Sequence, residues 1–284
     1  MPASNAIASV HSALERVRAE RPLVHNITNF VVMNVTANAL LALGASPVMA
    51  HAPEEVEELA ALAGALVLNI GTLSGPWVGS MLLAGRAAAG RGVPVVLDPV
   101  GAGASRMRTR TTLDLLHEVR PAILRGNASE ILAVAGALDA VDSARLEAIM
   151  AGAGATRGVD SAHSGRGVEE VARAVARAAG CVVVVSGAVD TVADARRTAF
   201  VSGGSELMTL VTGMGCTATA LTGAFAAVVP DPFEAAVAGM AVMSAAGGAA
   251  AARSQGPGGM QAQFLDTLYT LDRADLEAQV RVEG

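Results

Sequence analysis

Short apolar runs rich in valine and leucine alternate with longer alanine-rich runs along most of the chain. The apolar runs carry no polar residue at every second position, which is typical of a parallel sheet covered on both faces. Strands are expected at Leu23–His25, Ser46–Met49, Ala65–Ile70, Val93–Asp98, Ala122–Arg125 and Cys181–Ser186. Helices are expected between them at Asn29–Leu43, Pro53–Ala63, Gly75–Arg91, Thr111–Val119, Ser129–Ala135 and Glu169–Ala179.

The pattern changes after Cys181, where "TVADARRTAFVSGG" predicts a pair of strands in a hairpin. Three further helices are expected at Gly215–Val228, Pro232–Arg253 and Gly259–Asp272. Segment 141–167 is the loosest stretch and is interpreted as an insertion loop with a helix. The strand–helix rhythm predicts an open α/β sandwich. Because neither a repeat nor a linker is visible, we expect one domain over residues 1–284.

The composition narrows the possible partners. The net charge is −6, no basic run is present, and only 2% of the 284 residues are aromatic. Nucleic acid and anionic membrane surfaces are therefore poor partners. The apolar runs fall short of the ~20 residues that span a bilayer. The two cysteines lack metal-ligand spacing, which suggests a reducing, cytoplasmic setting, and Cys181 is interpreted as core.

Cys216 follows two glycines in "LMTLVTGMGCTATALTGAFAAV", where a strand-like approach meets a helix. The free amides and the dipole at a helix N-terminus favour an anion, and glycine lets the backbone approach it closely. The same partial positive charge favours the thiolate of Cys216. This pattern indicates contact with a phosphoryl group. A tight turn with a small buried cysteine fits the residues equally well.

Asp98 ends an apolar strand in "VVLDPVGAGA". The carboxyl ends of parallel strands face the ligand crevice in open α/β sheets, so this carboxylate is a candidate Mg²⁺ ligand. It could instead be a turn residue or a helix N-cap. The "GAGA" stretch lacks the spacing of a dinucleotide-binding turn.

The stretch "LRGNASEI" places Arg125 at the end of a strand, with Asn127 and Glu130 three residues apart at the start of a helix. The simpler interpretation is a capping box, in which Asn127 is the N-cap and Glu130 is its partner. The functional alternative places Arg125 on a nucleotide phosphate and Glu130 on a metal-bound water.

Polar residues also follow the first strand in "HNITN". Asn29 is expected to cap the next helix, which leaves Asn26 free to point into a cleft, whereas His25 is interpreted as structural. Met49 supplies a soft apolar wall. Strand tips in a parallel sheet converge on one edge, so these residues and the glycine and hydroxyls of "NIGTLSG" should border one crevice. His11, His51, His117 and His163 are interpreted as surface residues.

Six motifs occur in order from about His25 to Arg253: "HNITNFVVMNVTANALLALGASPVM", "LVLNIGTL", "VVLDPVGAGA", "LRGNASEI", "VVVVSGAVDTVAD" and "VTGMGCTATALTGAF". Together they resemble the hydroxyethylthiazole kinase family. The resemblance implies a ribokinase-like three-layer α/β sandwich without a lid domain. It also implies phosphorylation of the alcohol of 4-methyl-5-(2-hydroxyethyl)thiazole with Mg-ATP in thiamine salvage. A homotrimer with active sites between subunits is expected.

The resemblance also implies residue roles. Cys216 stands where most ribokinase-like enzymes carry a catalytic aspartate. Asp98 and Glu130 would support the metal. The positions similar to ATP contacts are Arg125, Asn127, Ser186 and Gly215. The positions similar to the thiazole pocket are Asn26, Met49, Gly71, Thr72 and Gly213.

Three other functions stay open at this level. One is a kinase of the same fold for another small alcohol, such as a sugar or a pyrimidine. Another is a non-catalytic nucleotide-binding protein. A nicotinamide-dependent oxidoreductase is suggested only by the glycine-rich turns.

Overall fold

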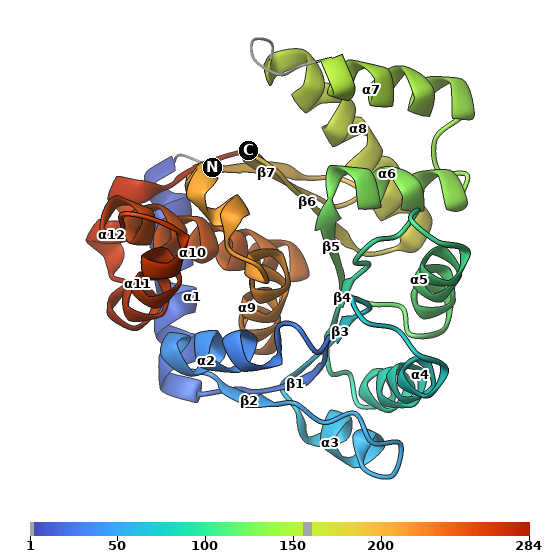
Figure 1. The fold of residues 1–284 in the computed structure, drawn as a ribbon, viewed down its shortest axis with the longest axis horizontal. Helices are drawn as coiled ribbons and strands as arrows, with labels where there is room; N and C mark the ends of the chain where they lie inside the picture. Colours follow the sequence, from blue (N-terminus) through green and yellow to red (C-terminus); the bar gives the residue numbers. More distant parts are fainter. Residues whose placement is uncertain (1–2, 156–160) are drawn as a thin grey trace.

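A central sheet lies between two layers of helices in the computed structural model, which describes residues 3–155 and 161–284 (Figure 1). Within these residues nine strands pair in the order β2-β1-β3-β4-β5-β6-β7-β8-β9. The first six strands pair in parallel, and the pairs from β6 to β9 are antiparallel. The strands are β1 Leu23–Ile27, β2 Ser46–Val48, β3 Ala65–Asn69, β4 Val95–Asp98, β5 Ile123–Asn127, β6 Val182–Ser186, β7 Val189–Ala193, β8 Thr198–Ser202 and β9 Arg281–Glu283.

The helices divide between the two faces of the sheet (Figure 1). One face carries α1 Ala3–Glu20, α2 Met33–Leu43, α9 Met214–Val228, α10 Pro232–Ala252, α11 Pro257–Thr270 and α12 Arg273–Gln279. The other carries α3 Val56–Leu62, α4 Gly75–Gly90, α5 Arg106–Glu118, α6 Ala128–Ala137 and α8 Ser161–Ala179, with α7 Ser143–Ala155 packed on α8. A 3₁₀ helix, η1 Glu206–Leu210, precedes α9.

Alternate strand residues enter two separate cores because successive side chains in a strand point to opposite faces. Val67 of β3 and Val96 of β4 pack in the α9 core, whereas Leu66 and Leu97 pack in the α4 core. Continuing this alternation to the strand ends turns the polar residues Asn69, Asp98, Arg125 and Ser186 toward α9. The period of the strands therefore gathers these side chains on one face.

Helix α10 runs through the α9 core and is buried along most of its length. It is apolar and long enough to cross a membrane by those two criteria alone, yet 83% of its most apolar window is buried inside the fold. We therefore describe it as a core helix.

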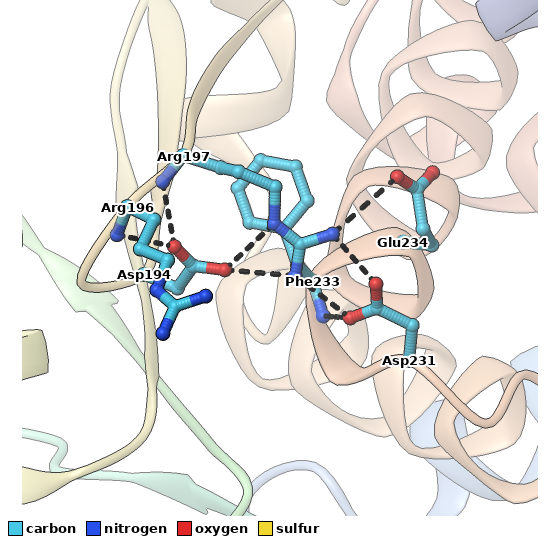
Figure 2. Close-up of polar contacts among 6 residues, drawn as sticks. All are labelled: Asp194, Arg196, Arg197, Asp231, Phe233 and Glu234. Atoms are coloured by element: carbon cyan, nitrogen blue, oxygen red, sulfur yellow. Dashed lines mark hydrogen bonds and ion pairs between the residues drawn. The ribbon is translucent and has the colours of Figure 1, made fainter.

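An arginine ties the β7–β8 hairpin to the start of α10 (Figure 2). Arg197 bonds Asp231 through two nitrogens, at 2.6 and 3.0 Å, and its Nε donates to Asp194 at 2.8 Å. Its guanidinium also lies 4.3 Å from the ring centroid of Phe233. The planar fork of arginine makes such a two-sided clamp possible, so the antiparallel edge is fastened to the main helical layer.

Most predicted elements are confirmed within a few residues at their ends. The predicted start of the second helix at Asn29 is wrong, because α2 begins at Met33. The strand-like approach to Cys216 is also wrong, since η1 occupies that segment. The loose segment 141–167 contains α7 and the start of α8, and its residues 156–160 lie outside the described part. Strand β9 was not predicted, because its single apolar residue, Val282, lies between two charged residues.

We predict that Gly239→Ala lowers the free energy of unfolding. A Cβ at this position would lie 2.7 Å from Oγ1 and 2.8 Å from Cα of Thr222 on the facing helix. Overpacking of about 1–3 kcal/mol should exceed the ~1 kcal/mol of helix propensity that alanine adds. The measurement is chemical denaturation.

The matched control is Gly79→Ala on α4, where nothing lies within 4 Å of the added Cβ. This variant should be stabilised by ~1 kcal/mol. Equal stability changes in the two variants would refute the close packing of α9 and α10.

Candidate active site

The first turn of α9 is placed by two glycines. Gly213 adopts a left-handed conformation with φ 86°, and α9 begins at the next residue. A side chain at Gly213 would be strained there and would also meet Val32 at 2.9 Å. Arg125 Nη1 donates to the carbonyl oxygen of Gly215 at 2.9 Å, across from β5. Cys216 therefore stands in the first turn of the helix, as predicted.

A chain of hydrogen bonds connects Cys216 to Asp98. Asn29 Nδ2 lies 3.5 Å from Cys216 Sγ and 2.8 Å from Asn69 Oδ1. Asn69 Nδ2 donates to Asp98 Oδ2 at 2.8 Å, and Thr219 Oγ1 donates to the same oxygen at 2.7 Å. The sulfur and the carboxylate thus share one network, built from two asparagines and a threonine of α9.

Burial dominates the ionisation of this network. It raises the pKa of Asp98 to about 6, although Arg125 and the donated hydrogen bonds oppose the shift and Glu130 adds to it. Burial, followed by the negative charge of Asp98, also raises the pKa of the Cys216 thiol. The sequence-based expectation of a favoured thiolate is therefore wrong, because desolvation and a neighbouring carboxylate outweigh the donors around the sulfur.

Glu130 forms the capping box that the simpler interpretation predicted. Its Oε2 accepts from the amide of Asn127 at 2.8 Å, and its Oε1 accepts from the amide of Gly101 at 2.8 Å. The carboxylate thereby joins the start of α6 to the loop after β4. It is buried and acts electrostatically on Asp98, so the capping role leaves it beside the crevice.

The residues present fit a magnesium ion held mainly by phosphate oxygens. Among the described residues no group of three acidic, histidine or cysteine side chains could hold a metal by itself. Asp98 and Glu130 nevertheless offer two buried carboxylates whose negative charges repel each other. Mg²⁺ is usually held by one or two carboxylates together with substrate phosphates and water, so this pair matches its requirement.

A cavity of about 540 Å³ opens beside the first turn of α9. Of the four predicted nucleotide residues, it is lined by Arg125, Ser186 and Gly215, whereas Asn127 is exposed outside it. Arg125 Nε and Ser186 Oγ are buried without a hydrogen-bond partner. Unsatisfied buried donors at a cavity wall are what an anionic, oxygen-rich ligand would satisfy.

The predicted acceptor residues do not line that cavity. Gly71 donates its amide to Asn69 Oδ1 at 3.0 Å, and Thr72 Oγ1 accepts from the amide of Phe30 at 3.2 Å. Asn26 is buried, its Nδ2 donates to the carbonyl of Val24 and its Oδ1 has no partner. Met49 is half-buried directly after β2.

Asn29 departs from its predicted role. It does not cap α2, and its side chain instead turns to Asn69 and Cys216 while its Oδ1 accepts from the amide of Val31. The local N-cap pattern concealed this, because the contacts that hold Asn29 come from residues 40 and 187 positions away.

The histidines and Cys181 have mostly the predicted settings. His25 is buried and its Nε2 lies 2.8 Å from the carbonyl of Ala50, and Cys181 is buried, which raises its pKa to about 12. His51 is exposed but stacks on Trp77 with ring centroids 3.9 Å apart, and Phe30 meets the same indole at 4.9 Å. His117 is exposed, His11 is half-buried, and the side chain of His163 lies outside the described part.

Arg108 is a residue that sequence reasoning missed. Its Nη1 donates to the carbonyls of Ile70 and Val100 at 2.8 and 2.6 Å, and its Nη2 donates to Gly71 at 2.7 Å. It therefore joins the loops after β3 and β4. A signal was present, because Arg108 lies in the first turn of α5, where the helix dipole disfavours a cation without another partner.

A larger cavity, of about 1000 Å³, lies between α1, α10 and the β7–β8 turn. Its walls are mostly apolar, and none of the predicted site residues lines it. Size alone does not identify the active site here, and the chemistry favours the smaller cavity beside α9.

Comparisons with known proteins agree with this geometry. The sequence model of the hydroxyethylthiazole kinase family matches residues 14–274 of this chain. The chain is 58% identical to a hydroxyethylthiazole kinase of Nitratidesulfovibrio vulgaris over 95% of both chains. It is 50% identical to that of Syntrophus aciditrophicus, again over 95% of both.

Solved structures give the same result. The hydroxyethylthiazole kinase of Pyrococcus horikoshii OT3 superposes with a TM-score of 0.86 at 43% identity, covering 96% of this chain and 98% of that one. A pyridoxal kinase of Staphylococcus aureus superposes with a TM-score of 0.58 at 13% identity, covering 80% and 88%, and it supports the ribokinase-like fold alone. The chain therefore belongs to the hydroxyethylthiazole kinase family.

Proposed function

We propose that this kinase transfers the γ-phosphoryl group of ATP to the hydroxyl of 4-methyl-5-(2-hydroxyethyl)thiazole, as a step of thiamine salvage. Membership of the hydroxyethylthiazole kinase family supports this reaction. The structural observation that carries the proposal is the network joining Cys216 to Asp98 beside Arg125. In this arrangement the acceptor site and the nucleotide cavity meet at the N-terminus of α9.

The nucleotide side is the 540 Å³ cavity. Arg125 and Ser186 present unpartnered buried atoms to it, and the first amides of α9 add partial positive charge where phosphate oxygens would lie. Asn127 would contribute from the mouth. Asp98 and Glu130 would hold Mg²⁺, which supplies charge neutralisation for the phosphates when it is bound.

Cys216 would lie beside the acceptor hydroxyl. Because its pKa is raised, it is protonated near neutral pH, and its role is to hold and orient the hydroxyl more than to remove its proton. Phosphoryl transfer has a loose transition state that needs position and charge neutralisation above all. Asn26, Met49, Gly71, Thr72 and Gly213 would border the thiazole ring.

The proposal includes a homotrimer with the acceptor site at a subunit boundary, in a cytoplasmic setting. Phe30 and Val31, which follow Asn29, are 66% and 62% exposed, and such neighbouring apolar side chains suit an interface beside the site. The two thiols, which form no disulfide, agree with a reducing compartment. A monomer in analytical ultracentrifugation at assay concentration would remove the trimer from the proposal.

We predict that the purified protein phosphorylates the thiazole alcohol in an ATP- and Mg²⁺-dependent manner. The measurement is phosphate ester formation by mass spectrometry across a panel of the thiazole alcohol, pyridoxal, a hydroxymethylpyrimidine and simple sugars. The thiazole alcohol should give the highest kcat/KM. A higher value for another alcohol would support the rival kinase, and ATP binding without any product would support the non-catalytic alternative.

We predict that Cys216→Ala lowers kcat by ~10–10²-fold, whereas Cys216→Ser and Cys216→Asp retain more activity because a polar group again meets the hydroxyl. The control is Cys181→Ala, which removes a buried thiol away from the network and should leave kcat unchanged. A loss of ~10³-fold or more in Cys216→Ala would identify the thiolate as a general base. A loss below twofold would reduce the residue to packing.

We predict that Glu130→Gln raises the Mg²⁺ concentration needed for half-maximal activity, because the amide keeps one acceptor oxygen for the capping box and loses the charge. Asp275→Asn is the matched control, since Asp275 holds the same position in the capping box of α12. Glu130→Gln should lose more stability, because both oxygens of buried Glu130 accept backbone amides and glutamine keeps one acceptor, and only Glu130→Gln should shift the Mg²⁺ titration. An unchanged titration would leave Glu130 with the capping role alone.

A further inference from the structure

One acidic side chain in the nucleotide cavity has no role in the reaction as described so far. Asp190 lies on β7 and lines the cavity together with Arg125 and Ser186. The strand register explains the placement: Arg125 pairs with Val184, and Val184 pairs with Val192. Since side chains alternate along each strand, all three cavity residues point to the α10 face.

The surroundings of Asp190 leave its carboxylate able to accept further hydrogen bonds. It is 6% exposed, its Oδ1 accepts from the amide of Gly187 at 3.0 Å, and Ser244 Oγ approaches Oδ2 only to 3.5 Å. Among the described residues no cation forms an ion pair with it, and Arg125 acts on it from a distance. Burial raises its pKa to about 6, so it is mainly ionised at neutral pH.

The order of the strands gives the cavity a direction. β5, β6 and β7 are neighbours, so Asp190 lies two strand spacings, about 10 Å, from the strand of Arg125. Met208, Met240 and Met243 also line the cavity and give it a soft, apolar wall. If Arg125 and the start of α9 receive the phosphates, the methionines suit the flat base, and Asp190 is left beside the sugar.

We propose that the Asp190 carboxylate accepts a hydrogen bond from a ribose hydroxyl of the bound nucleotide and makes this kinase discriminate against nucleotides that lack that hydroxyl. The inference rests on the proposed use of ATP in this cavity. An ionised carboxylate is only an acceptor, so it would repel phosphate and favour a hydroxyl. Acidic side chains fill this role for ribose in other nucleotide-binding folds.

The selectivity has a physical cause. When a nucleotide lacks the hydroxyl, the buried carboxylate oxygen loses its partner and stays out of water. Sites that hydrogen-bond a substrate hydroxyl reject analogues without it for this reason. Because Gly187 still satisfies part of the carboxylate, we expect a preference of ~10–10²-fold and not the larger factors of fully enclosed sites.

The experiment compares ATP, 2′-deoxy-ATP and 3′-deoxy-ATP as phosphoryl donors at saturating thiazole alcohol. In the unmodified protein, one deoxy donor should have a kcat/KM ~10–10²-fold below that of ATP. In Asp190→Ala, the value for ATP should fall to within about threefold of that deoxy donor, whose own value barely changes. Asp190→Asn, which keeps the shape and one oxygen, should be intermediate and covers the case in which the alanine variant does not fold.

Asp194→Asn is the matched control, because this carboxylate follows the same strand but pairs with Arg197 outside the cavity. It should keep the full preference for ATP. Equal use of all three donors by the unmodified protein, or a preference that survives in Asp190→Ala, would overturn the proposal. So would discrimination that depends only on the 6-amino group of the base, tested with purine riboside triphosphate.

A failure of the proposed function would look different. If the unmodified protein phosphorylates no alcohol with any donor, that failure concerns the acceptor reaction. Calorimetric Kd values for ATP and the two deoxy analogues then decide the role of Asp190 by the same ratios in the same variants. Equal Kd values, or no binding of ATP, would overturn the inference.

Discussion

The hydrogen bond from Thr219 to Asp98 is the contact on which the site depends, because it joins the helix that carries Cys216 to the strand that carries the carboxylate. Thr219 and Asp98 are both buried, and a buried carboxylate without a hydrogen-bond donor would destabilise the fold. Thr219 and Asn69 supply that donation, so the position of α9 along the sheet is set by a polar contact as well as by packing. Small residues make the approach possible: a Cβ at Gly223 would lie 2.6 Å from Val67 of β3.

The charged groups of the site act on the pKa of Asp98 in opposite directions. Arg125 lowers the pKa values of both Asp98 and Asp190, while burial raises them, and Glu130 acts against Asp98. A bound polyanion would add negative charge next to Arg125 and the amides of α9. Its cation would add positive charge next to the carboxylates. The protein holds the charges in place before a ligand arrives, which is the preorganisation that phosphoryl transfer requires.

The placement of the residues proposed for the nucleotide side could be predicted from the sequence, because strand signals determine it. Unbroken apolar runs located the parallel strands, and the rule that ligands bind at their carboxyl ends brought Asp98 and Arg125 to one edge. The capping box of Asn127 and Glu130 was also predictable, since both partners lie within one helical turn. The raised pKa of the Cys216 thiol was not predictable from the sequence, because it depends on burial and on a carboxylate 118 positions away in sequence.

The loops proposed to form the acceptor side were harder to predict, because contacts distant in sequence hold them. Arg108 fastens two of them through carbonyl oxygens, and Asn29 leaves its expected capping position to reach Asn69. The only tryptophan, Trp77, holds a third by stacking on His51, two residues after Met49. None of these contacts has a local periodicity, and of these residues Asn29 is the one that contacts the sulfur of Cys216. A change in alcohol specificity could therefore arise in these loops while the sheet and its nucleotide cavity stay unaltered.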